Sequence, residues 1–282
     1  MSYTINLREM ARNPTVVIVG VGGTGSLLAD SICRILKGSD IKLLLVDMDR
    51  VEEHNLVRQN YYAGDIGKFK SQVLAERLSR QYGRPIGYSV MPYEKDMFDT
   101  KMSIGIQKAQ NLILLGCVDS AAARRTIAET FSGRFMDDIW WLDSGNGHSS
   151  GQVLIGNIKD KSQLREAFDA DAHTVTKLPI PSVQLPALLI PPTVPERPQD
   201  CAEAVDDDAQ SPTINQAMAT LMADFTWKLL SGKLTSMGAY VDLDAGTLQY
   251  VQASPVNVAR LLSVGVDELM KNKCALGARY HT

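Results

Sequence analysis

Residues 15–25 read TVVIVGVGGTG, and this stretch decides the fold. Its first five residues are apolar or β-branched, which predicts a short strand buried on both faces of a sheet. A helix is predicted next, because apolar residues recur at helical spacing over residues 25–36. The turn between them carries Gly20, Gly22, Gly23 and Gly25 in the pattern G-x-G-x-x-G. Glycines in such a turn let the backbone approach a phosphate, which the N-terminus of the helix attracts.

A carboxylate follows where a nucleotide ribose would need it. Asp47 comes directly after the next predicted strand, Lys42–Val46. An acidic side chain at that place holds ribose hydroxyls in dinucleotide-binding folds. The glycine turn and Asp47 therefore predict an adenine nucleotide site, without separating ATP from NAD or FAD. The alternative is a glycine turn that only packs the helix against the strand.

Strand and helix signals alternate through the first half of the chain. Further strands are predicted at 111–115, 140–142 and 152–155, and further helices over Lys70–Tyr82 and 121–131. Strands separated by helices of this length predict an α/β fold. We expect a Rossmann-like, doubly wound and mostly parallel sheet with helices on both faces.

The composition changes in the second half. Eight of the 12 prolines lie between positions 179 and 212, so we predict a long, extended, proline-rich crossover loop over residues 177–210. A core helix is expected from Ser211 and Pro212 to about Leu230. A hairpin and a helix over residues 256–273 complete a C-terminal helix and β-hairpin portion.

The 282 residues fit one large α/β core. We predict a single domain over residues 1–282 with four parts. These parts are an N-terminal segment (1–14), a nucleotide-binding half (15–156), the crossover loop (177–210) and a C-terminal half (211–282).

Composition limits the partners. The formal net charge is −3, so we expect no nucleic-acid partner bound through bulk charge. No apolar run approaches the ~20 residues that a membrane span needs. Charged residues in the first 14 positions oppose a signal peptide, and we expect a cytoplasmic protein without a membrane partner.

The four cysteines lie far apart, so we expect no zinc site.

Three further strings make the nucleotide prediction more specific. Residues 47–59 fit D-x-D-x-V-x-x-x-N-L-x-R-Q, residues 65–70 fit D-I-G-x-x-K, and residues 117–119 fit C-x-D. Together they resemble the ThiF/MoeB/HesA family, bacterial relatives of the adenylation domain of ubiquitin-activating enzymes. The D-x-G of residues 143–145 and the string Q-S-x-x-I-N-Q-A-M at 210–218 extend the resemblance. Within the family, the chain looks most like the ThiF-family proteins of PRTRC systems.

The resemblance implies an adenylyltransferase. In that chemistry, the C-terminal glycine carboxylate of a small ubiquitin-like or sulfur-carrier protein attacks the α-phosphate of ATP, and pyrophosphate leaves. ATP and Mg²⁺ are the implied cofactors, and a homodimer is the implied assembly. The implied nucleotide contacts include Gly20, Gly22, Gly23, Gly25, Asp47 and Asp49. For Asp49, a purely structural turn is the alternative.

The resemblance also implies catalytic residues. Asn55, Arg58 and Lys70 are implied to contact the phosphates, where cations offset the repulsion between a carboxylate and a polyanion. Asp119 is implied as the Mg²⁺ ligand. The alternatives are solvated surface cations at Arg58 and Lys70, and a helix cap at Asp119.

Cys201 is the implied nucleophile of a later step. It matches the cysteine of the family's C-x-E-A segment, which in some members bonds covalently to the carrier protein. A small apolar packing residue is the alternative. The N-terminal R-Y-x-R-Q string of the family is missing here, and Arg8 or Arg12 is the candidate for its arginine, which reaches the partner protomer's site. The family's rhodanese-like extension is also missing, which argues against sulfur donation by this chain.

Two other functions remain open from the residues. An NAD-dependent oxidoreductase would share the glycine turn and Asp47, but it has no use for Arg58, Lys70 and Asp119 together. A catalytically inactive binding scaffold would keep the fold. ATP–pyrophosphate exchange and nucleotide affinity separate these functions from adenylation.

Overall fold

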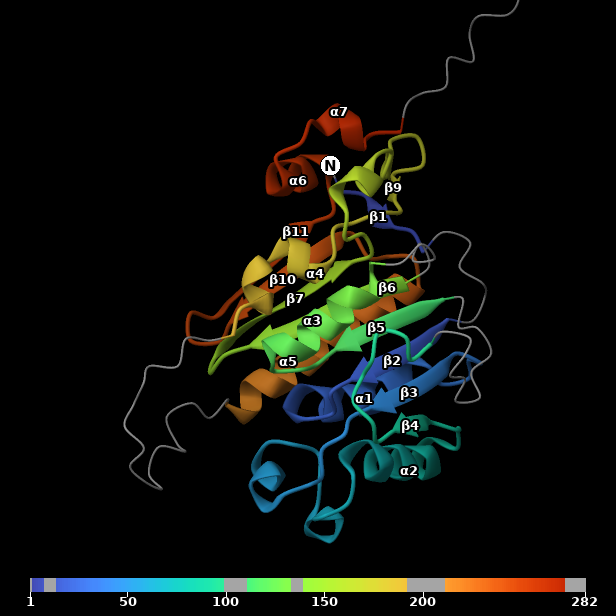
Figure 1. Cartoon of the computed structure of the whole chain (residues 1–282), viewed down its shortest axis with the longest axis vertical. Helices are drawn as coiled ribbons and strands as arrows, with labels where there is room; N and C mark the ends of the chain where they lie inside the picture. Colours follow the sequence, from blue (N-terminus) through green and yellow to red (C-terminus); the bar gives the residue numbers. More distant parts are fainter. Residues whose placement is uncertain (1, 8–13, 99–110, 133–138, 192–210, 272–282) are drawn as a thin grey trace, which may run out of the picture.

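The computed structural model describes residues 2–7, 14–98, 111–132, 139–191 and 211–271. Within these residues, eight strands form one central sheet in the order β11-β10-β7-β6-β5-β2-β3-β4 (Figure 1). The strands are β2 (Thr15–Val19), β3 (Lys42–Val46), β4 (Gly87–Ser89), β5 (Leu112–Gly116), β6 (Ile139–Asn146), β7 (Ser150–Gly156), β10 (Ser236–Asp242) and β11 (Thr247–Gln252).

The sheet has a parallel part and an antiparallel part. Strands β6, β5, β2, β3 and β4 are parallel neighbours. Strands β7, β10 and β11 then extend the sheet in antiparallel pairing. The five parallel strands end at the same edge, where the site described below lies.

Helices cover both faces of the sheet (Figure 1). Helices α1 (Gly23–Ile35), α2 (Lys70–Tyr82) and α5 (Pro212–Leu230) pack on one face. Helix α3 (Ala121–Thr130) packs on the other. The mostly parallel, doubly wound architecture confirms the fold predicted from the sequence.

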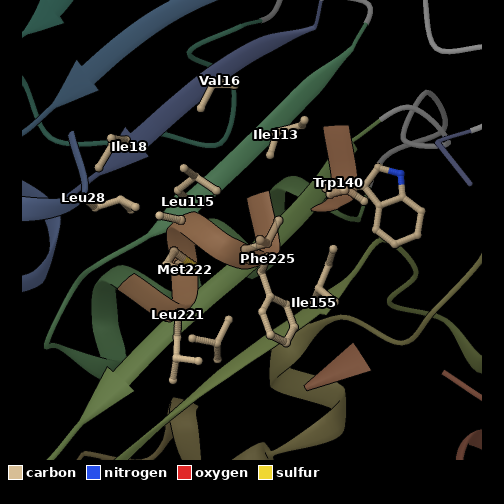
Figure 2. Close-up of a cluster of buried hydrophobic side chains, with 14 of the residues drawn as sticks. Val16, Ile18, Leu28, Ile113, Leu115, Trp140, Ile155, Leu221, Met222 and Phe225 are labelled. Atoms are coloured by element: carbon tan, nitrogen blue, oxygen red, sulfur yellow. The ribbon is translucent and has the colours of Figure 1, made fainter. Parts of the chain in front are cut away.

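Alternation along the strands explains the two layers. On β2, Val16 and Ile18 face the α1 and α5 side, whereas Val17 and Val19 face the α3 side. All four are buried, as expected for a strand covered on both faces. Figure 2 shows the larger cluster, in which Met222 and Phe225 of α5 lie against strand residues that include Leu115, Trp140 and Ile155.

Three features differ from the sequence prediction or were missed by it. The proline-rich segment is not fully extended, since α4 (Pro181–Gln184) and the 3₁₀ helix η4 (Pro186–Leu189) each begin with a proline. Proline is tolerated there because the first helical N–H has no intrahelical partner. The prediction of one helix over 256–273 is also wrong. The segment forms two helices, α6 (Pro255–Leu262) and α7 (Val266–Leu269), and the chain leaves helical geometry at Ser263, which has a left-handed φ of 56°.

The third feature is a small sheet in the order β1-β9-β8. It joins β1 (Thr4–Ile5) to β8 (Phe168–Asp169) and β9 (Thr174–Val175), strands of two residues that carry almost no periodic signal. Along the described part of the chain, none of the helices is both long and apolar enough for a membrane crossing.

Candidate functional site

A cavity of about 720 Å³ lies at the edge where the parallel strands end. Segments after β2, β3 and β5 line it, together with the end of β6 and the first turn of α5. In α/β sheets, ligands bind at this edge. Its polar and glycine lining includes Gly20, Gly22, Gly23, Thr24, Asp47, Asp49, Arg58, Gln59, Lys70, Asp119, Arg124, Ser144, Asn146, Gln152 and Asn215.

The glycine turn has a specific backbone shape. Gly20 has φ of 83°, and a Cβ there would lie 2.8 Å from the carbonyl oxygen of Cys117. A Cβ on Gly25 would overlap the carbonyl oxygen of Gly20. Gly20, Gly22 and Gly23 line the cavity, whereas Gly25 lets the helix pack tightly behind the turn.

Asp47 is held by two backbone donors. The N–H groups of Val21 and Asp49 donate to its carboxylate at 2.7 and 2.8 Å. Burial raises the pKa of Asp47, and these two hydrogen bonds act in the opposite direction. The carboxylate therefore links β3 to the glycine turn and lines the cavity where a ribose ligand was predicted.

Lys70 begins helix α2 and lines the cavity. Its side chain is only 8% exposed, and Nζ lies 3.4 Å from the Asp49 carboxylate, which is 59% exposed. The backbone N–H of Lys70 donates to the Asp49 carbonyl at 2.9 Å. The structure thus places a nearly buried cation at the cavity, with a partner that solvent reaches.

Arg58 and Asn55 lie on the segment around the 3₁₀ helix η1 (Glu53–Val57). Arg58 is half-buried and lines the cavity. Asn55 is buried and does not line it, and its Oδ1 accepts from the backbone N–H of Glu52 at 3.0 Å. The structure therefore gives Asn55 a capping function in η1, while its phosphate contact stays a prediction.

The D-I-G string fixes this segment to helix α2. Arg77 of α2 forms an ion pair with Asp65 at 2.9 Å and donates to the Asn60 carbonyl. The Asp65 carboxylate also accepts from the N–H of Tyr62 at 3.1 Å. Lys70 lies on the same helix as Arg77, and Arg58 lies two residues before Asn60, so the contacts of Arg77 hold both cations beside one cavity.

Asp119 lies at the exposed rim, after β5. Beneath it, Arg124 of α3 donates to the Asp143 carboxylate at 3.0 Å and to the Asp119 and Ser144 carbonyls at 3.3 Å. Arg124 and Asp143 are both buried. Burial raises the pKa of Asp143 to about 6, although the charge and hydrogen bond of Arg124 lower it. This pair fixes the Asp119 segment to β6.

Four residues considered in the sequence analysis, Cys201, Cys274, Arg8 and Arg12, lie outside the residues that the structure describes. The other two cysteines, Cys33 and Cys117, are described. Burial raises the pKa of Cys33 to about 11 and also raises that of Cys117, so neither thiol is activated. Among the described residues, no three His, Cys, Asp or Glu side chains gather in a way that would hold a metal ion.

Comparison with known proteins assigns the family. The profile of the ThiF family matches residues 4–260. The chain belongs to the ThiF family. Its glycine turn, Asp47, Arg58, Lys70 and Asp119, the residues quoted for that resemblance, lie around one cavity.

Curated relatives of this ThiF-family chain carry the name ubiquitin-like modifier-activating enzyme 5. The protein from Drosophila mojavensis is 34% identical over 144 residues, covering 49% of this chain and 35% of the relative. The protein from Gallus gallus is 34% identical over 196 residues, covering 60% and 48%. The chain thus spans about a third to a half of the length of these relatives.

Solved structures share the ThiF fold at low identity. The crystal structure of PaaA has a TM-score of 0.55 at 18% identity, covering 88% of this chain and 66% of that one. The Escherichia coli MccB structure with ATP has a TM-score of 0.52 at 16% identity, with the same coverage. At these identities, the likeness shows the fold.

Sequence reasoning missed several residues of the ThiF cavity. Gln59, Ser144, Asn146 and Asn215 line it, but amides and hydroxyls carry no charge pattern that marks them in a sequence. The available signal was weak. Asn215 lies in the Q-S-x-x-I-N-Q-A-M string, within the first turn of a helix predicted to begin at Pro212.

Proposed function

We propose that this ThiF-family chain is an ATP-dependent adenylyltransferase. Its substrate would be the C-terminal glycine of a small ubiquitin-like or sulfur-carrier protein. The observation that carries the proposal is a single cavity that gathers the glycine turn, Asp47, two cations and Asp119. The names of the relatives, which are ubiquitin-like modifier-activating enzymes, support the substrate class.

The geometry suits attack of a carboxylate on a phosphate. Asp47 would hold the ribose, and the N-terminus of α1 would receive phosphate oxygens. Lys70 and Arg58 would stabilise the charge that builds up while the carboxylate approaches the α-phosphate and pyrophosphate leaves. A hydride-transfer enzyme would need the glycine turn and Asp47, but not this pair of cations.

Asp119 is suited to a magnesium ion bound together with ATP. Mg²⁺ is commonly held by one or two carboxylates plus substrate phosphates, and Asp119 is an exposed carboxylate on the cavity rim. When bound there, the ion would offset negative charge on the phosphates. The Arg124 contacts would keep the Asp119 segment in place.

The test is ATP–³²P-pyrophosphate exchange with candidate small proteins that end in glycine. We expect exchange that depends on the carrier and on its terminal carboxylate. Binding of NAD⁺ that is tighter than binding of MgATP, with no exchange, would favour the oxidoreductase. Absence of affinity for every nucleotide would favour a binding scaffold.

A covalent second step would use Cys201, on the basis of its sequence segment alone. We expect the wild-type protein to form a thiol-sensitive adduct with its carrier, and Cys201→Ser to lose the adduct while exchange continues. An adduct that persists in Cys201→Ser would assign the step to another cysteine. Active exchange without any adduct would mean that the acyl-adenylate passes directly to a separate acceptor.

We further propose a homodimer. Between β3 and α2, close to the cavity, the apolar side chains of Met48, Val57, Tyr62 and Ile66 are exposed, and a second copy would cover them. Light scattering at micromolar concentration should give twice the chain mass, and Val57→Asp should lower it. Val256→Asp, at another exposed position on α6, is the control. A monomeric wild type would contradict the proposal.

A further inference from the structure

Asn215 is a buried polar residue with an unused donor. It lies in the first turn of α5 and is 1% exposed. Its Oδ1 accepts from the Thr24 hydroxyl and from Nδ2 of Asn146, each at 3.4 Å. Its Nδ2 has no hydrogen-bond partner among the described residues. Buried amide groups are normally paired, so this donor needs an explanation.

The unused donor lies on the glycine turn. A Cβ on Gly23 would be 2.7 Å from Nδ2 of Asn215, so the amide rests directly on the first residue of α1. At that end of α1, Gly22 supplies no side-chain cap, and the first turn holds no acidic residue. The first N–H groups of a helix lack intrahelical partners. Gly22, Gly23 and Asn215 all line the cavity, so both sets of donors belong to the same wall.

Donors without acceptors, at the positive end of a helix, favour an anionic oxygen. We propose that Asn215 binds the nucleotide, with Nδ2 donating to a phosphate oxygen held above the N-terminus of α1. This inference rests on the proposed function for the identity of the nucleotide. It adds a binding residue from the C-terminal half to a site that the motifs place in the N-terminal half.

Asn157 shows what a purely structural asparagine looks like in this chain. It is 2% exposed, comparable to Asn215. Its Nδ2 donates to the Thr176 carbonyl at 3.0 Å, and its Oδ1 accepts from the N–H of Leu178 at 2.8 Å. Both ends of that amide are used, and it does not line the cavity.

The experiment uses the full chain and Asn215→Asp, which keeps the shape of the side chain but replaces the donor with a carboxylate oxygen. Calorimetry measures the affinity for MgATP, AMP and adenosine. We expect Asn215→Asp to weaken binding of MgATP and AMP at least tenfold, and to leave adenosine binding unchanged. Asn157→Asp is the matched control and should change none of the three affinities.

Equal MgATP affinity in wild type and folded Asn215→Asp would overturn the proposal, and so would an equal loss for adenosine. If Asn215→Asp does not fold, Asn215→Leu replaces it, and the same loss is expected because the donor is gone.

A measurement on wild type is independent of both variants. The side-chain amide signal of Asn215 should shift on addition of MgATP, whereas that of Asn157 should not, and an unmoved Asn215 signal would also overturn the proposal. Pyrophosphate exchange is measured separately, so a failure of adenylation is distinguished from a failure of this contact.

Discussion

Two ion pairs near the cavity are built differently. Lys70 and Asp49 lie 3.4 Å apart, and the carboxylate is 59% exposed. Arg124 and Asp143 lie 3.0 Å apart, and their side chains are 9% and 1% exposed. Arg124 also donates to two carbonyls. The first pair has a loose geometry and a partner in water, whereas the second is closed off from solvent.

The difference indicates that Lys70 is available to a ligand, whereas Arg124 has a structural function. An exposed carboxylate gives little stabilisation, so a phosphate can replace Asp49 as the partner of Lys70 at small cost. A buried pair cannot change partners in this way, because loss of either member leaves an uncompensated charge. We therefore propose that Lys70 binds the ligand and that Arg124 positions the Asp119 segment.

The largest expected effect is on stability, from Arg124→Met. Removal of Arg124 leaves Asp143 buried without its counter-charge, and breaking a buried pair costs about 3–5 kcal/mol. We expect a loss of this size in the free energy of unfolding at pH 8, measured by urea denaturation. Arg125→Met is the control, because the neighbouring Arg125 is exposed and, among the described residues, donates only to the Leu189 carbonyl.

The loss should depend on pH. Without Arg124, the pKa of Asp143 should rise further above about 6. The carboxyl then remains neutral in the folded variant at pH 5, and the loss should be smaller there than at pH 8. An equal loss at both pH values would show that the packing of the arginine stem, and not its charge, accounts for the destabilisation.

Next in size is the loss of exchange activity in Lys70→Ala and, separately, in Arg58→Ala. A single electrostatic donor to a transition state contributes about 2.7–4 kcal/mol, or roughly 10²–10³-fold in rate. We expect losses of this size in pyrophosphate exchange, with little change in stability. Lys68→Ala is the matched control, since Lys68 is exposed and does not line the cavity. More than a tenth of wild-type exchange in either variant would contradict the assigned role.

A third prediction concerns the titration of Asp143 in wild type. Burial raises the pKa of this carboxyl to about 6, so carbon-13 NMR should show its midpoint there and not near 4. Because the pKa of Asp143 is higher in the folded than in the unfolded protein, the protonated carboxyl favours the folded state. This contribution to the free energy of unfolding is complete below the unfolded pKa of ~3.9. That contribution is lost as pH rises through about 6. Asp169, whose pKa is lowered by the Ala172 N–H and by Lys271, should titrate below its usual range.

The smallest expected effect is that of Asp49→Asn on stability. Solvent-exposed ion pairs contribute ~0–1 kcal/mol. Because the Asp49 carboxylate is exposed and the pair is long, we expect the free energy of unfolding to fall by no more than about 1 kcal/mol. Thermal or urea denaturation measures it. A loss above about 2 kcal/mol would place this pair in the same class as Arg124 and Asp143, and the comparison would fail.

The sequence predicted the elements with strong periodicity. The bounds of β2, β3 and α2 match the predicted ranges, because buried strands and amphipathic helices leave a clear pattern. The break at Ser263 could not be predicted, since a left-handed serine depends on tertiary contacts. The residue pair Arg124 and Asp143 was also not identified, because a buried ion pair between distant elements has no local signal.

The candidate site was predictable where it follows strand ends. The glycine turn and Asp47 come directly after buried strands, Asp119 lies three residues after β5, and topology brings those ends together. Asn55 marks the limit of this reasoning. Its place in a family string implies a phosphate contact, which stays a prediction, and the structure adds that its amide oxygen caps a 3₁₀ helix. A string identifies positions, and only packing shows which side chains reach the cavity.

The contact between the glycine turn and α5 has a consequence for the order of folding. Thr24 and Asn215 are 191 residues apart in the chain, so one wall of the cavity is missing until the last third of the polypeptide has been synthesised and has docked on α1. Contacts of such long sequence separation form late and slow the folding of a domain. Nascent chains halted before α5 should therefore present the glycine turn without the amide that rests on it. The proposed nucleotide site would then be completed by one of the last steps of folding, although the glycine motif at its wall is among the first residues to be made.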